Sequence, residues 1–257
     1  MSFLRFLLPY TYFYGSRVKQ LKYNLYYLII DWAVPFALLT YFTDYDWQHA
    51  LVHFVLAYLA FISIYEIGYL GNDVYSVRKE DKPRRRVKGF DPSDAVVLLW
   101  IGMRLAAFGL ISWYLHVLTN PLWLAFYVVL AIFFYLHNAL KDKELKVMTF
   151  VNLAFIRYFA PVFIFLTPAQ LMLLAAPIFL NYVFYRTLMY MDSKDLLNMP
   201  SRRAPAYKVN YYLLALGVSS LLSLMGQSWV PVAITAYYLL FWTAVKVAGF
   251  QPPQADN

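Results

Sequence analysis

The chain has 257 residues, of which 62% are hydrophobic and only 14% are charged, and its formal net charge is +8. A soluble domain usually has about 25% charged residues, so this composition excludes an ordinary soluble protein and indicates a membrane protein with several spans. The absence of cysteine excludes disulfides, thiolate metal ligands and a cysteine nucleophile.

A membrane-spanning helix needs about 20 mostly apolar residues, and the chain contains eight such stretches. Residues 1–15 precede them and are interrupted by Arg5, without a small-residue cleavage site, so we expect an amphipathic lead-in and no cleavable signal peptide. The predicted spans are residues 24–43, 49–71, 94–115, 121–140, 147–166, 169–191, 210–226 and 229–249. We therefore expect an all-α, polytopic membrane helix bundle that forms a single transmembrane domain over residues 1–257.

Basic residues are distributed unevenly between the predicted loops. Four loops contain no Lys or Arg, namely residues 44–48, 116–120, 167–168 and 227–228. Most of the 22 basic residues lie in the N-terminal segment and in residues 72–93, 141–146 and 192–209. The positive-inside rule predicts that these basic loops and both termini are cytoplasmic, and we expect a bacterial inner membrane. The positive charge thus reflects topology and does not indicate a nucleic-acid partner.

A polar stripe follows the end of the second predicted span. If the helix continues past the membrane surface, spacings of three and four place five side chains on one face: Glu66, Tyr69, Asp73, Ser76 and Glu80. Asn72 lies beside this stripe. A polar face is costly in lipid, so we expect it to face the interior, where its oxygens suit Mg²⁺. The alternative is a solvated helix end, which the position of Glu66 inside the span disfavours.

A second acidic stretch follows the sixth predicted span. On a helix Asp192 and Asp195 are one turn apart, so both carboxylates can reach one ion. Asn181 and Tyr185 share their face. The alternative is an ordinary charged loop. Both acidic stretches follow an apolar, aromatic helix and precede proline and arginine. This similarity predicts two related halves, residues 24–140 and 147–249, with a site at the interface between them.

The order of these stretches resembles the UbiA superfamily of intramembrane prenyltransferases. Members carry an Asn-Asp-x-x-Asp-x-x-x-Asp motif after the second helix and another Asp-rich motif after the sixth. Asn72 and Asp73 match the first motif, whereas Ser76 and Glu80 stand where the family has aspartates. The second motif keeps Asp192 and Asp195, with Met199 at the position of its third acid.

This resemblance implies a UbiA-like bundle of eight transmembrane helices, or the nine usual in the family, around a central cavity. It implies transfer of a prenyl group from a Mg²⁺-bound prenyl diphosphate to a lipophilic or aromatic acceptor. The implied catalytic residues are Asp73, Asp192 and Asp195. The implied Mg²⁺ ligands are Asn72, Asp73, Glu80, Asp192 and Asp195. The implied substrate-binding residues are Glu66, Tyr69, Ser76, Arg78, Lys82, Lys143, Lys146, Tyr185, Arg186, Arg202 and Arg203.

Two other functions of the same superfamily stay open. One is a non-catalytic or divergent UbiA-like membrane protein that binds an isoprenoid lipid, and the other is a transferase that uses phosphoribosyl diphosphate. A third hypothesis places a haem or redox metal on His49, His53 and His116, at the outer helix ends. It is disfavoured because interface histidines are common and the nearby acids are few.

Three arginines, Arg104, Arg157 and Arg186, interrupt the predicted spans. Intramembrane arginines nearly always face an interior. Arg186 is expected to pair with Glu66 or to hold phosphate. For Arg104 and Arg157 we weigh structural pairing against the lining of a polar cavity or the binding of an anionic lipid head group.

Overall fold

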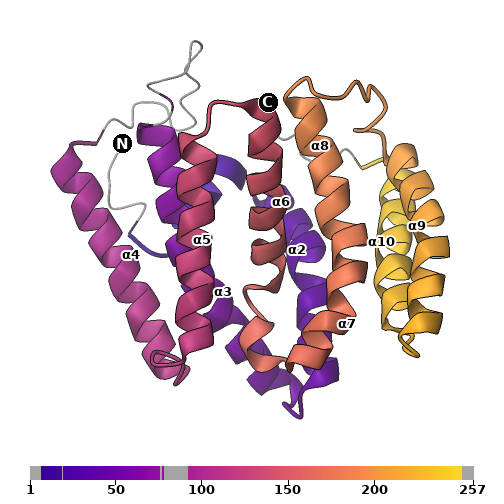
Figure 1. Ribbon diagram of the computed structural model, residues 1–257, viewed down its shortest axis with the longest axis horizontal. Coiled ribbons are helices and arrows are strands. Elements are labelled where there is room, and N and C mark those ends of the chain that lie inside the picture. Colours follow the sequence, from indigo (N-terminus) through magenta and orange to yellow (C-terminus); the bar gives the residue numbers. More distant parts are fainter. Residues whose placement is uncertain (1–6, 19, 76, 78–91, 251–257) are drawn as a thin grey trace. The chain divides into compact units, whose positions relative to one another are not determined.

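The computed structural model describes residues 7–18, 20–75, 77 and 92–250. These residues form helices and no strands, as Figure 1 shows. Seven of their helices are long and apolar enough to cross a membrane, which confirms the prediction of an all-helical, multi-pass membrane protein. The seven are α2 (Leu21–Phe42), α3 (Trp47–Val74), α4 (Asp94–Tyr114), α5 (Pro121–Ala139), the continuous helix Pro168–Ser193, α9 (Pro205–Met225) and α10 (Val230–Val247).

The predicted span at residues 147–166 differs from the observed helix. Helix α6 runs from Lys143 to Phe159, a length of 17 residues. It ends just before Pro161, because the residue preceding a proline is disfavoured in the α conformation. A short turn, η4 (Phe163–Phe165), follows. Helix α6 therefore lies at the lower limit of length for a spanning helix.

Side chains at the helix starts explain where several of these helices begin. Asp46 accepts hydrogen bonds from the backbone amides of Gln48 and His49 at the start of α3. Asn120 caps α5 in the same way, immediately before Pro121. Such caps satisfy amides that have no partner within the helix, and proline is well tolerated at the first helical position.

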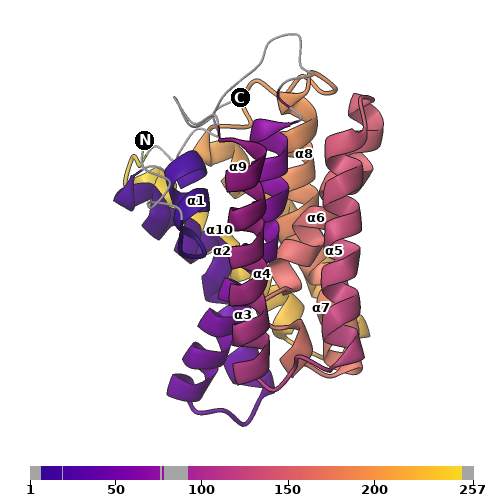
Figure 2. The same cartoon turned by 90° about the vertical axis from the view of Figure 1, so that its left-hand side faces the viewer.

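The chain divides into two compact units. Unit 1 comprises Met1–Lys141 with Phe159–Phe165, and unit 2 comprises Asp142–Tyr158 with Leu166–Asn257. In unit 1, α3 contacts both α4 and α5, and Figure 2 shows α3 beside α4. A Cβ atom added at Gly68 would lie 2.3 Å from the Phe134 ring, so glycine permits the approach of α3 to α5. In unit 2, α9 packs along α10 (Figure 1). The predicted relationship between two halves stays a prediction.

Two segments of π-helix interrupt the regular geometry. The helix Pro168–Ser193 consists of α7 (Pro168–Ile178), the π-helix η5 (Phe179–Phe184) and α8 (Tyr185–Ser193). The hydroxyls of Tyr211 and Tyr212 on α9 donate to the carbonyls of Leu180 and Asn181, at 2.5 and 2.9 Å. The N-terminal segment contains α1 (Thr11–Phe13) and the π-helix η2 (Tyr14–Val18). π-Helices are rare in proteins overall, and those that occur often lie at functional sites. The residues next to η2 and η5 are therefore candidates for a functional site.

Candidate functional site

Asp73 lies one residue before the end of α3, and both of its carboxylate oxygens already accept hydrogen bonds. Arg17 in η2 donates from both terminal nitrogens, Nη1 to Oδ2 at 2.7 Å and Nη2 to Oδ1 at 3.0 Å. The Tyr12 hydroxyl donates to Oδ2 at 2.8 Å, and the Asn72 amide donates to Oδ1 at 3.3 Å. A bidentate arginine contact is among the strongest that a carboxylate makes, so Asp73 is fully engaged by the protein.

The surroundings of Arg17 strengthen this contact. Its guanidinium lies 4.2 Å from the centroid of the Tyr69 ring, in a cation–π arrangement. Burial lowers the pKa of Arg17, but hydrogen bonding and charge from Asp73 outweigh burial and hold this pKa above its ordinary value. Burial, and next the Asp73 charge, raise the pKa of the Tyr12 hydroxyl well above its usual range, so this hydroxyl stays a donor.

Glu66 has a different partner from the one that the sequence analysis considered. Its Oε2 atom lies 2.8 Å from Nε of Arg104, and neither side chain is exposed. The Phe13 amide donates to Oε1 at 2.7 Å, while Arg104 also donates to the carbonyls of Leu7 and Leu8. Arg104, rather than Arg186, is therefore the ion-pair partner of Glu66. Through the bonds to Phe13, Leu7 and Leu8, the ion pair attaches the N-terminal segment to α3 and α4 of unit 1. This is the structural pairing that the sequence analysis weighed for Arg104.

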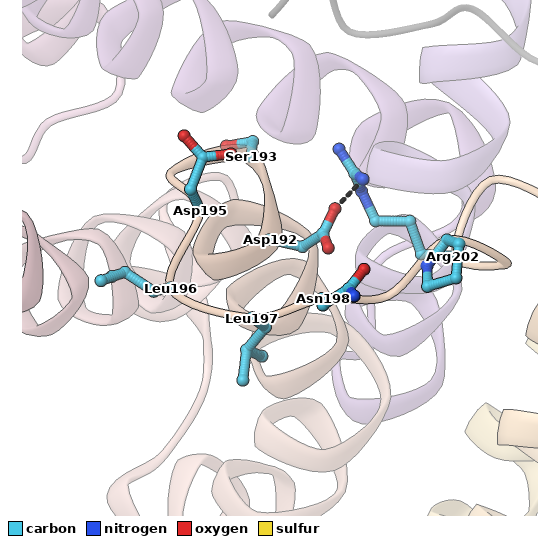
Figure 3. Close-up of a pocket in the computed structure, with 8 residues that line it drawn as sticks. Asp192, Ser193, Asp195, Leu196, Leu197, Asn198 and Arg202 are labelled. Carbon is cyan, nitrogen blue, oxygen red and sulfur yellow. Dashed lines mark ion pairs between the residues drawn. The ribbon is translucent and has the colours of Figure 1, made fainter.

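Asp192 lies near the end of α8 and has fewer partners than Asp73. Its Oδ1 atom accepts from the Met199 amide at 2.6 Å, and its Oδ2 atom forms an ion pair with Arg202, drawn in Figure 3. The backbone of Met199, at the position of the third acid in the family motif, thus orients Asp192. The carboxylate lines an open cavity of about 530 Å³ within unit 2. The lining residues are Asp192, Ser193, Asp195, Leu196, Leu197, Asn198, Pro200 and Arg202.

Asp195 does not lie one helical turn beyond Asp192, as the sequence analysis expected. Helix α8 ends at Ser193, and Asp195 has a left-handed backbone with φ of 62°. The Leu196 amide donates to the Met191 carbonyl and the Asp195 amide to the Asp192 carbonyl, which is the Schellman pattern that terminates helices. In Figure 3 the Asp195 carboxylate points away from that of Asp192. The expected helical spacing of these two carboxylates is therefore wrong, and their sharing of one ion stays a prediction.

Three buried polar atoms in this part of unit 2 have no hydrogen-bond partner among the described residues. They are Nε of Arg202, the hydroxyl of Tyr185 and Oδ1 of Asn181. The Asn181 amide nitrogen is satisfied by the Pro177 carbonyl at 2.9 Å. The Tyr185 hydroxyl interacts electrostatically with the guanidinium groups of Arg202 and Arg186. A buried polar group without a partner costs about 1–3 kcal/mol, so each of these atoms can be stabilised by a ligand or a water molecule.

The remaining predicted residues fall into three groups. Lys143 lies beside the second motif, because its ammonium donates to the Lys194 carbonyl at 3.3 Å. The guanidinium of Arg186 lies 4.9 Å from the centroid of the Tyr182 ring, Lys146 is half-buried and Arg203 is exposed. Four predicted residues lie outside the described part of the chain, namely Ser76, Arg78, Glu80 and Lys82.

The histidines of the third hypothesis make local contacts. Nδ1 of His49 lies 2.6 Å from Asp46, and Nδ1 of His53 lies 2.8 Å from the His49 carbonyl. The His53 ring stacks on Tyr45, with centroids 4.7 Å apart. Within residues 7–18, 20–75, 77 and 92–250, no group of three or more His, Asp or Glu side chains is arranged to hold a metal. These contacts favour a structural role for His49 and His53.

Magnesium fits the two motifs differently. Asp192 and Asn198 bring oxygen donors to an open cavity, which is what Mg²⁺ needs when it also keeps waters and contacts phosphate. Asp73 fits an ion less well in its present arrangement, because Arg17, Tyr12 and Asn72 donate four hydrogen bonds to its two oxygens, whereas each oxygen of Asp192 has one partner. Site residues that the sequence analysis missed are Arg17 and Tyr12. Their only advance signal was a basic and aromatic N-terminal segment.

Comparisons of this chain with protein-family models, with curated proteins and with solved structures find no match.

Proposed function

We propose that this chain is an intramembrane prenyltransferase of the UbiA type. It transfers a prenyl group from a Mg²⁺-bound prenyl diphosphate to a lipophilic or aromatic acceptor. The proposal includes the finer features expected from the sequence. These are eight transmembrane helices with α6 as the eighth, or nine in all, a central cavity, cytoplasmic termini and site loops, and a bacterial inner membrane.

The unsatisfied Nε atom of Arg202, the ion-pair partner of Asp192, carries this proposal together with the unsatisfied hydroxyl of Tyr185. Arg202 Nε and the Tyr185 hydroxyl are hydrogen-bond donors without acceptors among the described residues; Tyr185 lies within the spanning helix Pro168–Ser193, and Arg202 lies in the loop that follows it. A diphosphate is rich in acceptor oxygens and carries the negative charge that arginine binds well. The Asn181 Oδ1 atom is an acceptor without a donor, which suits a hydroxyl group on the second substrate.

In this proposal, basic residues of unit 2 bind the diphosphate and neutralise its charge. Arg202 and Lys143 bind the diphosphate, with Arg186, Lys146 and Arg203 adding positive charge around it. Donors fixed where negative charge develops lower the barrier for departure of the leaving group. Mg²⁺, when held by Asp192 and Asn198, supplies further charge neutralisation to the leaving diphosphate.

The reaction exchanges one carbon–oxygen bond for a bond to the acceptor. The bond between the allylic carbon and the diphosphate oxygen breaks, and its electron pair leaves with the diphosphate. A nucleophilic atom of the acceptor forms the new bond to that carbon and loses its proton to water. The face of the Tyr185 ring stabilises the positive charge that develops on the allylic group.

The test is incubation of the purified protein with labelled prenyl diphosphates and a lipid extract, with and without Mg²⁺. We expect Mg²⁺-dependent release of diphosphate and a labelled lipid product. Asp192→Asn should lower both by about 100-fold or more, whereas Glu144→Gln, which alters an exposed acid of unit 2, should leave both unchanged. Absence of Mg²⁺-dependent diphosphate release with every donor, phosphoribosyl diphosphate included, would reject the enzyme.

One observation favours the non-catalytic alternative. Asp73 is occupied by Arg17, Tyr12 and Asn72, as a carboxylate with a purely structural role is. A protein that only binds an isoprenoid lipid needs no metal at this carboxylate. The same assay separates the two functions, because a binding protein retains the labelled prenyl compound without releasing diphosphate.

A further inference from the structure

A buried lysine lies at one end of the contact between α9 and α10. The Lys208 ammonium is 3.6 Å from the centroid of the Trp242 ring, and the Lys208 residue is only 5% exposed. One turn after Lys208 in α9 and one turn before Trp242 in α10, the Tyr212 and Tyr238 rings stack with centroids 5.4 Å apart. Lys208 thus belongs to the packed contact between these helices and is not a surface charge.

Lys208 has no counter-ion among the residues that the structure describes. The Trp242 ring face is its contact there, and no carboxylate, carbonyl or hydroxyl accepts a hydrogen bond from its ammonium. The last carbonyls of α10 accept hydrogen bonds from following amides and none from Lys208. These carbonyls belong to Ala244, Val245 and Lys246. A cation–π contact compensates only part of the cost of burying an ammonium group.

The position of Lys208 in its helix adds to this imbalance. It lies in the first turn of α9, where the helix dipole contributes positive potential. Ala204 at the N-cap gives no side-chain hydrogen bond, and the first turn contains no acidic residue. The loop just before it carries Arg202 and Arg203. Pro205 has no N–H and the Tyr207 amide donates to the Ala204 carbonyl, so the Ala206 amide and the helix dipole add to the charge of Lys208 at this end of a spanning helix.

We propose that Lys208 on the face of Trp242, together with the uncapped N-terminus of α9, binds the phosphate group of an anionic amphiphile. Phosphate suits the site because the Ala206 amide at the helix N-terminus and an ammonium can both donate to its oxygens. An amphiphile suits it because α9 is long and apolar enough to cross the membrane, so its end lies at the level of lipid head groups. This inference rests neither on Mg²⁺ nor on the proposed transfer reaction.

Binding is tested with the full chain in uncharged detergent micelles that contain EDTA. The probes are dioleoyl phosphatidic acid, inorganic phosphate alone, and dioleoyl phosphatidylcholine, whose head group has no net charge. Retention of lipid by native mass spectrometry and the rise in unfolding temperature report binding. We expect phosphatidic acid to bind and phosphatidylcholine not to bind. Binding of inorganic phosphate as well would show that the head group suffices, and its failure would show that the acyl chains contribute.

Matched lysine variants locate the site. We expect Lys208→Gln to weaken phosphatidic acid binding by about tenfold or more, which is typical for loss of a charged hydrogen-bond partner. Lys208→Arg, which keeps the charge, should retain most of the affinity. Lys246→Gln, which removes an exposed lysine of α10, should leave the affinity unchanged.

Stability without lipid separates a ligand site from a structural one. An unpaired buried charge is unfavourable, so Lys208→Gln should unfold at the same or a higher temperature than the unmodified protein in the absence of lipid. An unchanged affinity in Lys208→Gln, or an equal loss in Lys246→Gln, would overturn the proposal. So would a lower unfolding temperature of Lys208→Gln combined with undiminished lipid binding.

Discussion

The two acidic motifs are equally buried but differ in how completely the protein satisfies them. Arg17 and Asp73 have side chains 11% and 6% exposed, and Arg202 and Asp192 have side chains 12% and 7% exposed. Asp73 receives a bidentate arginine, a tyrosine hydroxyl and an amide. Asp192 receives one arginine and one backbone amide at the wall of a cavity, and the Nε atom of Arg202 is left without a partner.

This difference separates a structural from a ligand-binding use of similar residues. In unit 1 the polar network is complete and anchors the N-terminal segment, so any change to it is expected to reduce stability. In unit 2 the network is incomplete, so the protein bears a cost that a ligand can relieve. Burial and charge alone do not reveal this difference, which appears only when every donor and acceptor is assigned.

The largest expected effect is on stability, from Asp73→Asn. This change leaves the Arg17 guanidinium without its counter-ion, which costs about 3–5 kcal/mol in a buried pair. Asp192→Asn should cost less, because Arg202 borders an open cavity and can turn toward water. Denaturant titration in detergent micelles measures the free energy of unfolding of both. Equal losses in the two variants would contradict the contrast between the motifs.

The second prediction concerns turnover and the other carboxylate. Asp192→Asn should lower the rate of diphosphate release by about 100-fold or more, as does removal of a group that stabilises developing charge. Release is followed at saturating prenyl diphosphate and Mg²⁺, with Glu144→Gln as the control. A rate within threefold of the unmodified protein would remove Asp192 from the proposed site.

A third prediction applies the same substitution to both motifs. Tyr12→Phe should cost about 1.5–3 kcal/mol, because its hydroxyl donates to a charged carboxylate. Tyr185→Phe should leave stability unchanged or raise it slightly, because its hydroxyl has no partner in the described residues. Thermal unfolding of the two variants side by side measures both effects. A loss in Tyr185→Phe as large as that in Tyr12→Phe would mean that the second motif is also complete.

The smallest expected effect concerns the helix packing behind the first motif. Gly68→Ala places a methyl group against the Phe134 ring, and overpacking of this kind costs about 1–3 kcal/mol. Gly102→Ala is the matched control, because nothing lies within 4 Å of its Cβ position. It should be neutral or stabilising by about 0.4–1 kcal/mol. Free energies of unfolding that are equal for the two variants would contradict the close approach of α3 and α5.

The helices were predictable from sequence because hydropathy and proline act locally. Apolar length alone identifies α3, and Pro121 and Pro168 mark the starts of α5 and α7. Residues 160–166 are apolar enough to extend α6, but hydropathy does not register the backbone constraint of Pro161. The local pattern likewise failed beyond Ser193, where a left-handed residue at Asp195 ends the helix.

The candidate site was predictable only in part. Spacing identified Asp73 and Asp192, because acids at the ends of apolar helices are unusual. It did not identify Arg17, which lies 56 residues from Asp73 along the chain. It also did not foresee the pairing of Glu66 with Arg104. Such pairs depend on which segments become neighbours in the folded protein, and the spacing of residues along the sequence does not reveal this.

The most direct test is the affinity for a non-hydrolysable donor, farnesyl thiodiphosphate, in the presence and absence of Mg²⁺. Binding that requires Mg²⁺, that falls at least about tenfold in Arg202→Gln and that is unchanged in Tyr12→Phe would agree with a diphosphate site at the second motif. Equal binding in EDTA, or an affinity of Arg202→Gln within twofold of the unmodified protein, would contradict it.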